Sequence, residues 1–323
     1  MACAPWVKMP PRKPALLRGR PGATLEKIDP VPPIAHAPTW ATEIPPLVPS
    51  WPSDVLSPEN PEQPLVVLVG FGYWGTIDAL PGTIVDLYRM VKVARQVLLT
   101  DRVVVVSDIT TEETVENLRD VVLEGDLEPD VFTFMSRLVE ENRLVIWRPE
   151  VDLVRVCRAG GSKLLVYFSG HGKLGALCLP NGALLRLDHF VDDIAAEAPT
   201  RQIVVVSDCC HAHTLRLPFV LSPGSGQWEQ TGPCPKNAAR VIALSASSLG
   251  QVSTTTTRGS AFTTRLADGL RRHFCLVDLL TETRTFGTPS TCSASFPEAL
   301  DLFRWMRPRC RVERHFLGGY LVR

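Results

Sequence analysis

From residue 65 onward, short apolar runs alternate with longer stretches whose apolar residues recur at helical spacing. Runs of four or five apolar residues cover positions 65–69, 103–106, 164–168, 203–206 and 241–244. Continuous runs of this length are typical of strands that are buried on both faces of a sheet. Helical spacing predicts helices over residues 84–98, 110–125, 131–141, 260–274 and 296–306. Strands alternating with helices predict an α/β fold in which helices cover both faces of a mostly parallel sheet.

Two segments depart from this pattern. Residues 1–64 hold 16 of the 28 prolines, and proline at this density disfavours both helix and sheet. We therefore expect a Pro-rich, largely disordered leader over residues 1–64 and one folded domain over residues 65–323. Residues 218–235 are rich in Gly, Pro and Ser, and we expect them to form a loop within that domain.

Composition and charge exclude several classes of function. The 34 basic and 34 acidic side chains cancel to a formal net charge of zero, whereas nucleic-acid and anionic-membrane binders need a surplus of Lys and Arg. No stretch approaches the ~18 consecutive apolar residues of a membrane span, and the N-terminus lacks the apolar core of a secretory signal. The nine cysteines are odd in number and scattered. They indicate reduced thiols in a cytoplasmic protein. From the charge balance and the lack of an apolar span, we expect this protein to bind neither nucleic acid nor membrane.

Residues suited to nucleophilic catalysis follow two of the predicted strands. The third strand continues into Ser169-Gly170-His171-Gly172 and the fourth into Asp208-Cys209-Cys210-His211. The carboxyl ends of parallel strands meet at one edge of a sheet, where α/β proteins place their chemistry. If the two strands are neighbours, His171 and Cys210 form a Cys–His dyad, in which imidazole activates sulfur and later protonates the leaving amine. The amides of Gly172 and Cys210 are then candidates for an oxyanion hole.

Two other patterns suggest a dinucleotide site and a metal site, but the surrounding sequence does not fit either. Residues 70–75 spell G-x-G-x-x-G, but Pro81 stands where a dinucleotide-binding helix begins, and Asp108 lies further along the chain than the acid of that motif. We interpret this segment as a loop beside the cleft. The Cys and His residues of segment 209–213 are metal-ligand types, but adjacent cysteines share one ion with difficulty and no second ligand pair is evident.

Together, these motifs resemble those of the metacaspases, a family of caspase-like cysteine peptidases. The resemblance rests on residues 167–172 and 208–212, with similar segments at 80–87, 244–251 and 259–263, all in the family's order. It covers roughly residues 65 to 275. It implies a caspase-like three-layer α/β/α sandwich with a mostly parallel central sheet and a cysteine endopeptidase activity. Proteolysis linked to stress or cell death is the setting that the family implies.

The resemblance gives His171, Cys210 and Gly172 the roles of general base, nucleophile and oxyanion donor in peptide-bond hydrolysis through an acyl-enzyme. This chemistry requires no redox or nucleotide cofactor. The family usually has Ser where Cys209 stands. Because neighbouring residues of an extended segment face opposite sides, only one of the two cysteines can meet His171, and the pattern favours Cys210 with Cys209 as the alternative. The rival to an active peptidase is a caspase-like module of weak or no activity that acts by binding partners.

Two acids are candidates for substrate selection. Asp208 lies two residues before the predicted nucleophile, and Asp86 follows the loop after the first strand. If both carboxylates face one pocket, they select protein or peptide substrates with Arg or Lys before the cleaved bond, the P1 position. Ser169 has a further pocket role in the family. The alternative for Asp86 is an acid that merely stabilises a helix N-terminus.

Many metacaspases need calcium, which acidic residues hold. Asp192 and Asp193 resemble the family's acidic pair in front of a helix, whereas Asn181 and Leu217 stand where further acids occur in the pattern. Calcium takes six to eight oxygen ligands. The resemblance therefore makes calcium a candidate activator, and no cofactor is required by the sequence.

The resemblance also divides the domain into parts. A large-subunit-like region covers residues 65–217, a linker covers 218–237 and a small-subunit-like region covers 238–323. A peptidase that prefers basic residues can cut itself near such a linker, and Arg216 and Lys236 are the candidate positions. We expect a monomer rather than a dimer.

Overall fold

The structure is a computed structural model of the chain. It describes residues 63–109, 118, 121, 123, 130–149, 151–159, 161–173, 175–197, 200–212, 217–222, 227–232, 240–247, 251–272, 276–285 and 291–295. The leader up to residue 62, most of the helix expected over 110–125, the helix expected over 296–306, and the candidate cleavage residues Arg216 and Lys236 lie outside the described residues. Within these ranges, no helix is both long and apolar enough to cross a membrane.

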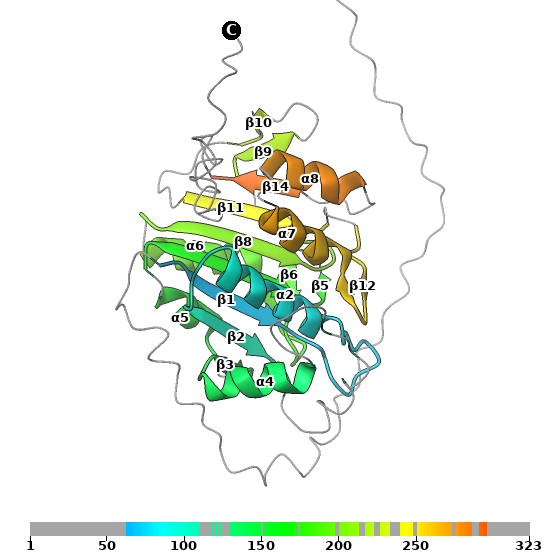
Figure 1. The fold of residues 1–323 in the computed structure, drawn as a ribbon. Helices are drawn as coiled ribbons and strands as arrows, with labels where there is room; N and C mark the ends of the chain where they lie inside the picture. The colour runs from blue at the N-terminus through cyan, green and yellow to red at the C-terminus, as the bar shows by residue number, and fades with distance from the viewer. Residues whose placement is uncertain are drawn as a thin grey trace, which may run out of the picture. The chain divides into compact units, whose positions relative to one another are not determined.

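A nine-stranded sheet forms the centre of the described domain, in the order β10-β9-β14-β11-β8-β4-β1-β2-β3 (Figure 1). Its strands are β1 (Leu65–Gly70), β2 (Val103–Ser107), β3 (Leu144–Ile146), β4 (Lys163–Ser169), β8 (Gln202–Asp208), β9 (Phe219–Ser222), β10 (Gln227–Gln230), β11 (Arg240–Ser245) and β14 (Thr291–Ala294). Neighbours from β11 to β3 pair in parallel, whereas the pairs β11–β14, β14–β9 and β9–β10 are antiparallel. The apolar runs of the sequence lie in β1, β2, β4, β8 and β11, which confirms the predicted strands.

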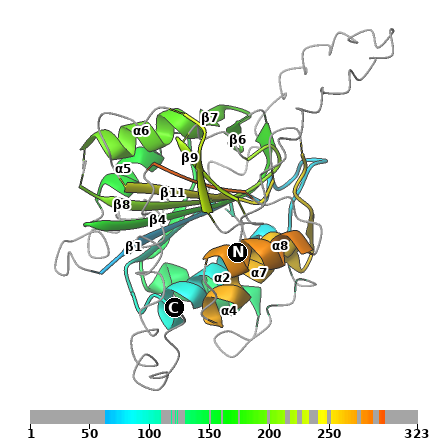
Figure 2. The same ribbon diagram turned by 90° about the horizontal axis from the view of Figure 1, so that it is seen from above.

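Helices cover both faces of this sheet (Figure 2). On one face lie α5 (Leu153–Arg158) and α6 (Leu187–Glu197), and on the other lie α2 (Thr83–Gln96), α4 (Val131–Glu140), α7 (Ala261–Arg271) and α8 (Leu276–Thr285). The predicted three-layer α/β/α sandwich with a mostly parallel sheet is therefore confirmed. Smaller sheets are formed by β5 (Gly172–Lys173), β6 (Ala176–Cys178) and β7 (Leu184–Arg186), and by β12 (Thr255–Thr256) and β13 (Gly259–Ser260).

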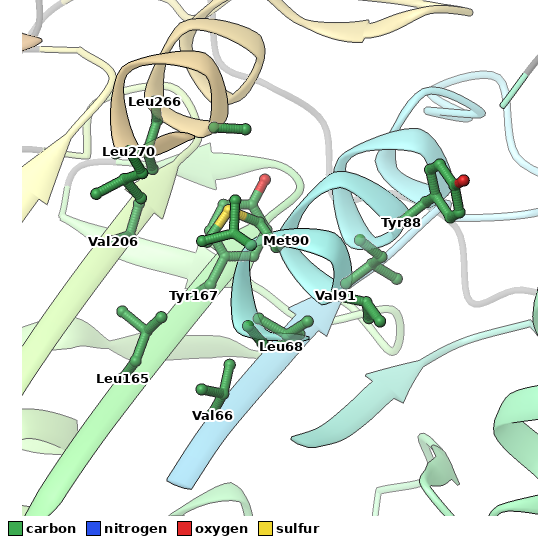
Figure 3. Close-up of a cluster of buried hydrophobic side chains, with 14 of the residues drawn as sticks. Val66, Leu68, Tyr88, Met90, Val91, Leu165, Tyr167, Val206, Leu266 and Leu270 are labelled. Carbon is green, nitrogen blue, oxygen red and sulfur yellow. The ribbon is translucent and has the colours of Figure 1, made fainter. Parts of the chain in front are cut away.

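Each face of the central sheet has its own hydrophobic core. Val66, Leu68 and Leu165 pack with the helices α2 and α7 (Figure 3). Val67 and Val69 belong to the core that includes α5 and α6. Successive side chains of a strand point to opposite faces, so strands with helices on both faces must be apolar at every position. This explains why β1 is a continuous apolar run.

The parallel register aligns the carboxyl ends of the central strands. Ser169, the last residue of β4, pairs with Gly70 of β1 on one side and with Asp208 of β8 on the other. On the far side of β8, Ser207 pairs with Ser245 of β11. The residues that follow β4 and β8 therefore leave the sheet side by side at one edge. This is the arrangement that a Cys–His dyad requires.

The prediction of a loop over residues 218–235 is wrong for β9 and β10, which pair as an antiparallel hairpin. Phe219 and Leu221 of β9 are buried, and β9 pairs with β14 of the small-subunit-like region. The alternation in β9 is only four residues long and is flanked by Pro and Gly, so contacts with distant residues decide the strand. The sequence pattern also missed α8 and β14, and α7 ends at Arg271 instead of residue 274.

Candidate active site

The ends of β4 and β8 meet in a pocket at the carboxyl edge of the sheet. Its volume is about 90 Å³ and its lining includes His171, Cys209 and Cys210 beyond the strand ends. Ser169 and Asp208, the last residues of the two strands, line it as well. The imidazole at the end of β4 is thus brought together with the carboxylate and the two thiols at the end of β8.

His171 is held through its backbone and its ring. Its N–H donates to the hydroxyl of Tyr73 at 2.8 Å, and its carbonyl accepts from the N–H of Cys178 at 3.0 Å. Ring Nε2 lies 2.7 Å from the carbonyl oxygen of Asp78. Because a carbonyl only accepts, Nε2 carries the proton of the neutral imidazole and Nδ1 is the basic nitrogen. Nδ1 is therefore the atom that can take a proton from a thiol.

The two adjacent cysteines have different surroundings. Cys209 is only 2% exposed, and burial, together with the charge of Asp208, raises the pKa of its thiol well above the usual range. Cys210 is half-buried in the pocket wall, with Sγ 3.7 Å from the carbonyl oxygen of Ser253. A buried thiol beside a carboxylate resists ionisation. Of the two thiols in the pocket wall, Cys210 is therefore the less buried one.

Gly172 permits the close approach of the two strand ends. A Cβ atom at this position lies 2.1 Å from the carbonyl oxygen of Cys210 and 2.7 Å from Sγ of Cys209. No side chain can be placed at such distances without moving one segment away from the other, so the glycine after His171 is needed for packing. Its role as an oxyanion donor stays a prediction.

Asp208 is the carboxylate that faces the pocket. It is 3% exposed and accepts hydrogen bonds from Ser253 Oγ at 2.9 Å and Thr263 Oγ1 at 2.6 Å. Thr263 also contacts the hydroxyl of Tyr167 at 2.7 Å, which ties this polar cluster to the core under α2 and α7. Asp208 is thus fixed by hydroxyl groups from two later segments of the chain.

Asp86, on α2, is fully buried behind the pocket wall. It accepts from Ser169 Oγ at 3.1 Å and from the N–H of Ser260 at 2.9 Å. The guanidinium of Arg89 lies 3.8 Å from its carboxylate. The predicted residues Asp86, Ser169 and Asp208 therefore belong to one buried cluster, but only the latter two line the pocket.

The two acids influence each other. Burial raises the pKa of Asp86 well above its ordinary value, and the nearby charge of Asp208 raises it further. Burial likewise raises the pKa of Asp208, although hydrogen bonds from serine and threonine hydroxyls oppose this. A cation that enters the pocket offsets both the burial cost and the mutual repulsion of the carboxylates.

Asp192 and Asp193, the candidate calcium ligands, lie on α6 with exposed side chains. Among the residues that the structure describes, no three or more His, Cys, Asp or Glu side chains are grouped so as to hold a metal ion. Two carboxylates on one helix supply fewer oxygens than calcium requires. This pair does not by itself fit a calcium site.

Several residues of the site were missed by sequence reasoning. Tyr73 and Asp78 belong to the connection between β1 and α2, of which residues 70–75 were interpreted as a loop beside the cleft. Ser253 lies in a Thr-rich segment without a recognisable motif, and Ser260 and Thr263 were noticed only as part of a family motif. All contact functional groups more than 40 residues away, and no local pattern predicts such contacts.

One family model matches the part of the chain that carries both motifs. The family model described as the caspase domain matches residues 152–286. This segment runs from α5 to α8 and contains both His171 and Cys210. Among solved structures, the crystal structure of caspase-1 from Spodoptera frugiperda is similar at 19% sequence identity, over 68% of this chain and 75% of that chain, with a TM-score of 0.42. No curated protein matches the chain.

The raised pKa of Asp86 predicts a specific dependence of stability on pH. The folded state binds this proton more tightly than the unfolded state, so the free energy of unfolding falls as the pH rises from about 4 to the folded-state pKa. In Asp86→Asn this contribution is absent, and the variant gains stability relative to the wild type as the pH rises. Urea unfolding over a pH series measures the difference.

The exposed carboxyl of Asp193 provides the matched control for this prediction. Asp193→Asn is expected to follow the wild type across the whole series. A difference between wild type and Asp86→Asn that stays constant with pH would contradict the raised pKa.

Proposed function

We propose that the chain is a metacaspase-like cysteine endopeptidase that cleaves after Arg or Lys, with Cys210 as nucleophile and His171 as general base. The observation that carries this proposal is the shared pocket, which holds a half-buried thiol, an imidazole and a buried carboxylate at the ends of two adjacent parallel strands. The caspase domain match over residues 152–286 supports the same chemistry.

In the proposed reaction, Sγ of Cys210 attacks the carbonyl carbon of the scissile peptide while its proton passes to Nδ1 of His171. The bond from Nε2 to the carbonyl of Asp78 keeps the ring in the required tautomer and stabilises the imidazolium. The amides of Gly172 and Cys210 stabilise the negative charge on the carbonyl oxygen. The imidazolium then protonates the leaving amine, and water hydrolyses the thioester.

The preference for Arg or Lys rests on the carboxylates beneath the pocket. Asp208 faces the pocket directly, so we assign it the contact with the cationic P1 side chain. Asp86 acts indirectly, by accepting a hydrogen bond from the Ser169 hydroxyl and by adding negative electrostatic potential to the pocket. Because Arg89 lies beside Asp86, part of the charge of Asp86 is already compensated. Asp208 is therefore expected to contribute more to selectivity than Asp86.

The fold is also compatible with self-processing. A cut after Arg216 or Lys236 separates β8 from β11 in sequence, but these strands pair in parallel from Arg240↔Gln202 to Ser245↔Ser207. Both strands are largely buried, so we expect the fragments to stay together. We further propose a monomer, because the edge strand β10 is four residues long, polar and mostly exposed, which disfavours pairing with another copy.

Turnover of fluorogenic peptides that end in Arg or Lys tests the activity, with and without calcium. We expect Cys210→Ala and His171→Ala to lose at least ~10³-fold in kcat/KM, as removal of a nucleophile or its base does elsewhere. Cys209→Ala is expected to retain turnover. Cys157→Ala, which removes a buried thiol on α5, serves as the control. Equal activity of Cys210→Ala would move the nucleophile to Cys209, and no turnover by the wild type in either condition would favour the binding module.

Replacement of Asp208 tests the selection of a basic P1 residue. In Asp208→Asn we expect kcat/KM for Arg-ended peptides to fall by at least ~30-fold, because loss of one partner of a buried charge pair costs ~2 kcal/mol or more. Activity towards a matched Gln-ended peptide is expected to change much less. Asp130→Asn, which retains a good helix cap on α4, is the control. Parallel losses on both peptides would contradict a charge-specific contact.

Prolonged incubation of the purified chain, with and without calcium, tests self-processing. We expect denaturing gels to show two fragments, and size-exclusion chromatography to show that they elute together. Arg216→Gln or Lys236→Gln is expected to remove the corresponding cut, and Cys210→Ala to remove both. Unchanged mobility of the wild type in both conditions would count against processing.

A further inference from the structure

The hydroxyl of Tyr73 replaces one backbone hydrogen bond next to His171, the candidate general base. β5 and β6 form an antiparallel hairpin whose register places His171 opposite Cys178. One bond of this pair is present, from the N–H of Cys178 to the carbonyl of His171. Instead of the second bond, His171 N–H donates to the Tyr73 hydroxyl at 2.8 Å, and that hydroxyl donates to the Cys178 carbonyl at 2.7 Å. The phenol thus bridges the two strands at the residue that carries the imidazole.

The same tyrosine also packs against the imidazole. The ring centroids of Tyr73 and His171 lie 4.6 Å apart, with an angle of 44° between the planes. A Cβ atom at Gly170 lies 2.7 Å from the Tyr73 hydroxyl, so the glycine before His171 allows the hydroxyl to reach the backbone. Burial raises the pKa of Tyr73, and the phenol therefore keeps the proton that it donates.

Tyr73 is held in turn by a carboxylate from the neighbouring strand. Asp108, directly after β2, accepts from the N–H groups of Gly72 and Tyr73, both at 2.7 Å. The φ angle of Tyr73 is 52°, a left-handed conformation that is unfavourable for a residue with a side chain. Two hydrogen bonds to a charged acceptor offset this strain. The carbonyl of Asp78, which accepts from Nε2 of His171, belongs to the same loop.

We propose that Tyr73 and Asp108 are positioning residues of the active site. Asp108 fixes the conformation of the loop after β1 and so the position of Tyr73. Tyr73 in turn sets the position of the His171 backbone and the plane of the His171 ring. The imidazole is thereby held in the pocket that it shares with Cys210. The inference rests on the proposed function for its chemistry. Since neither residue lines the pocket, both act through His171.

Steady-state kinetics of Tyr73→Phe gives the first test. The substitution keeps the ring but leaves His171 N–H and the Cys178 carbonyl without their hydroxyl partner. We expect kcat to fall about 10-fold to 100-fold while KM stays within about twofold, because a misplaced base slows the chemical step and leaves the pocket unchanged. Tyr88→Phe, which alters another buried tyrosine on α2, is the matched control and is expected to keep both constants.

A graded series at Asp108 tests the second half of the proposal. Asp108→Asn retains one acceptor for the two N–H groups, and Asp108→Ala retains none. We expect kcat to decrease in the order wild type, Asp108→Asn, Asp108→Ala, again with KM nearly constant. If Tyr73→Phe fails to fold, as judged by thermal unfolding, Asp108→Asn provides the same readout. Equal kcat values across folded members of both series would overturn the proposal.

The rate at which iodoacetamide alkylates Cys210, followed by mass spectrometry, separates this inference from the proposed function. Alkylation requires the thiolate that His171 promotes and does not require peptide hydrolysis. We expect Tyr73→Phe and Asp108→Ala to be alkylated more slowly than the wild type and Tyr88→Phe, even if the wild type hydrolyses no peptide. Unchanged alkylation rates in folded variants would show that the two residues stabilise the fold without positioning His171.

Discussion

The parallel pairing of β4 with β8 is the interaction on which the site depends. It places Ser169 opposite Asp208, so His171 and Cys210, each two residues further along, emerge at the same edge. A slip of one residue would turn the side chains of either strand to the wrong face. Cores on both faces of the sheet oppose such a slip. The close approach at Gly172 also requires this register, since the two strand ends leave no room for a side chain. Buried apolar packing thus sets the geometry of a polar pocket.

Burying Asp86 and Asp208 next to each other costs electrostatic free energy. Two carboxylates lie within one buried cluster, and burial raises the pKa of both. Hydroxyl and amide donors on Ser169, Ser253, Ser260 and Thr263 satisfy their oxygen atoms without cancelling their charge. Arg89, 3.8 Å from the carboxylate of Asp86, offsets part of this cost, and the other printed contacts of the two acids are hydrogen bonds without positive charge. A buried acidic cluster of this kind lowers stability, which is the trade-off expected where binding is favoured at the expense of stability.

The sequence was most informative where burial is two-sided or where residue types are unusual. Apolar runs located β1, β4 and β8 because strands covered on both faces need apolar side chains throughout. The Gly-flanked histidine and the tandem cysteines located the strand ends. The hairpin β9–β10 escaped because its strands are short and depend on pairing with β14. The contacts of Tyr73 and Ser253 escaped because loop conformation brings them to the site. Specificity and processing stay predictions, since they depend on substrates and on segments outside the described residues.

The order of the strands explains which loops contact His171 and Cys210. In the sheet, β8 and β4 lie between β11 and β1. The loop after β1 lies beside His171 and supplies the Asp78 carbonyl to its ring. The segment after β11 lies beside the cysteines, where the Gln251 carbonyl accepts from His211 N–H and the Ser253 carbonyl lies near Cys210 Sγ. His171 and Cys210 therefore each contact the segment that follows the neighbouring strand, β1 for His171 and β11 for Cys210.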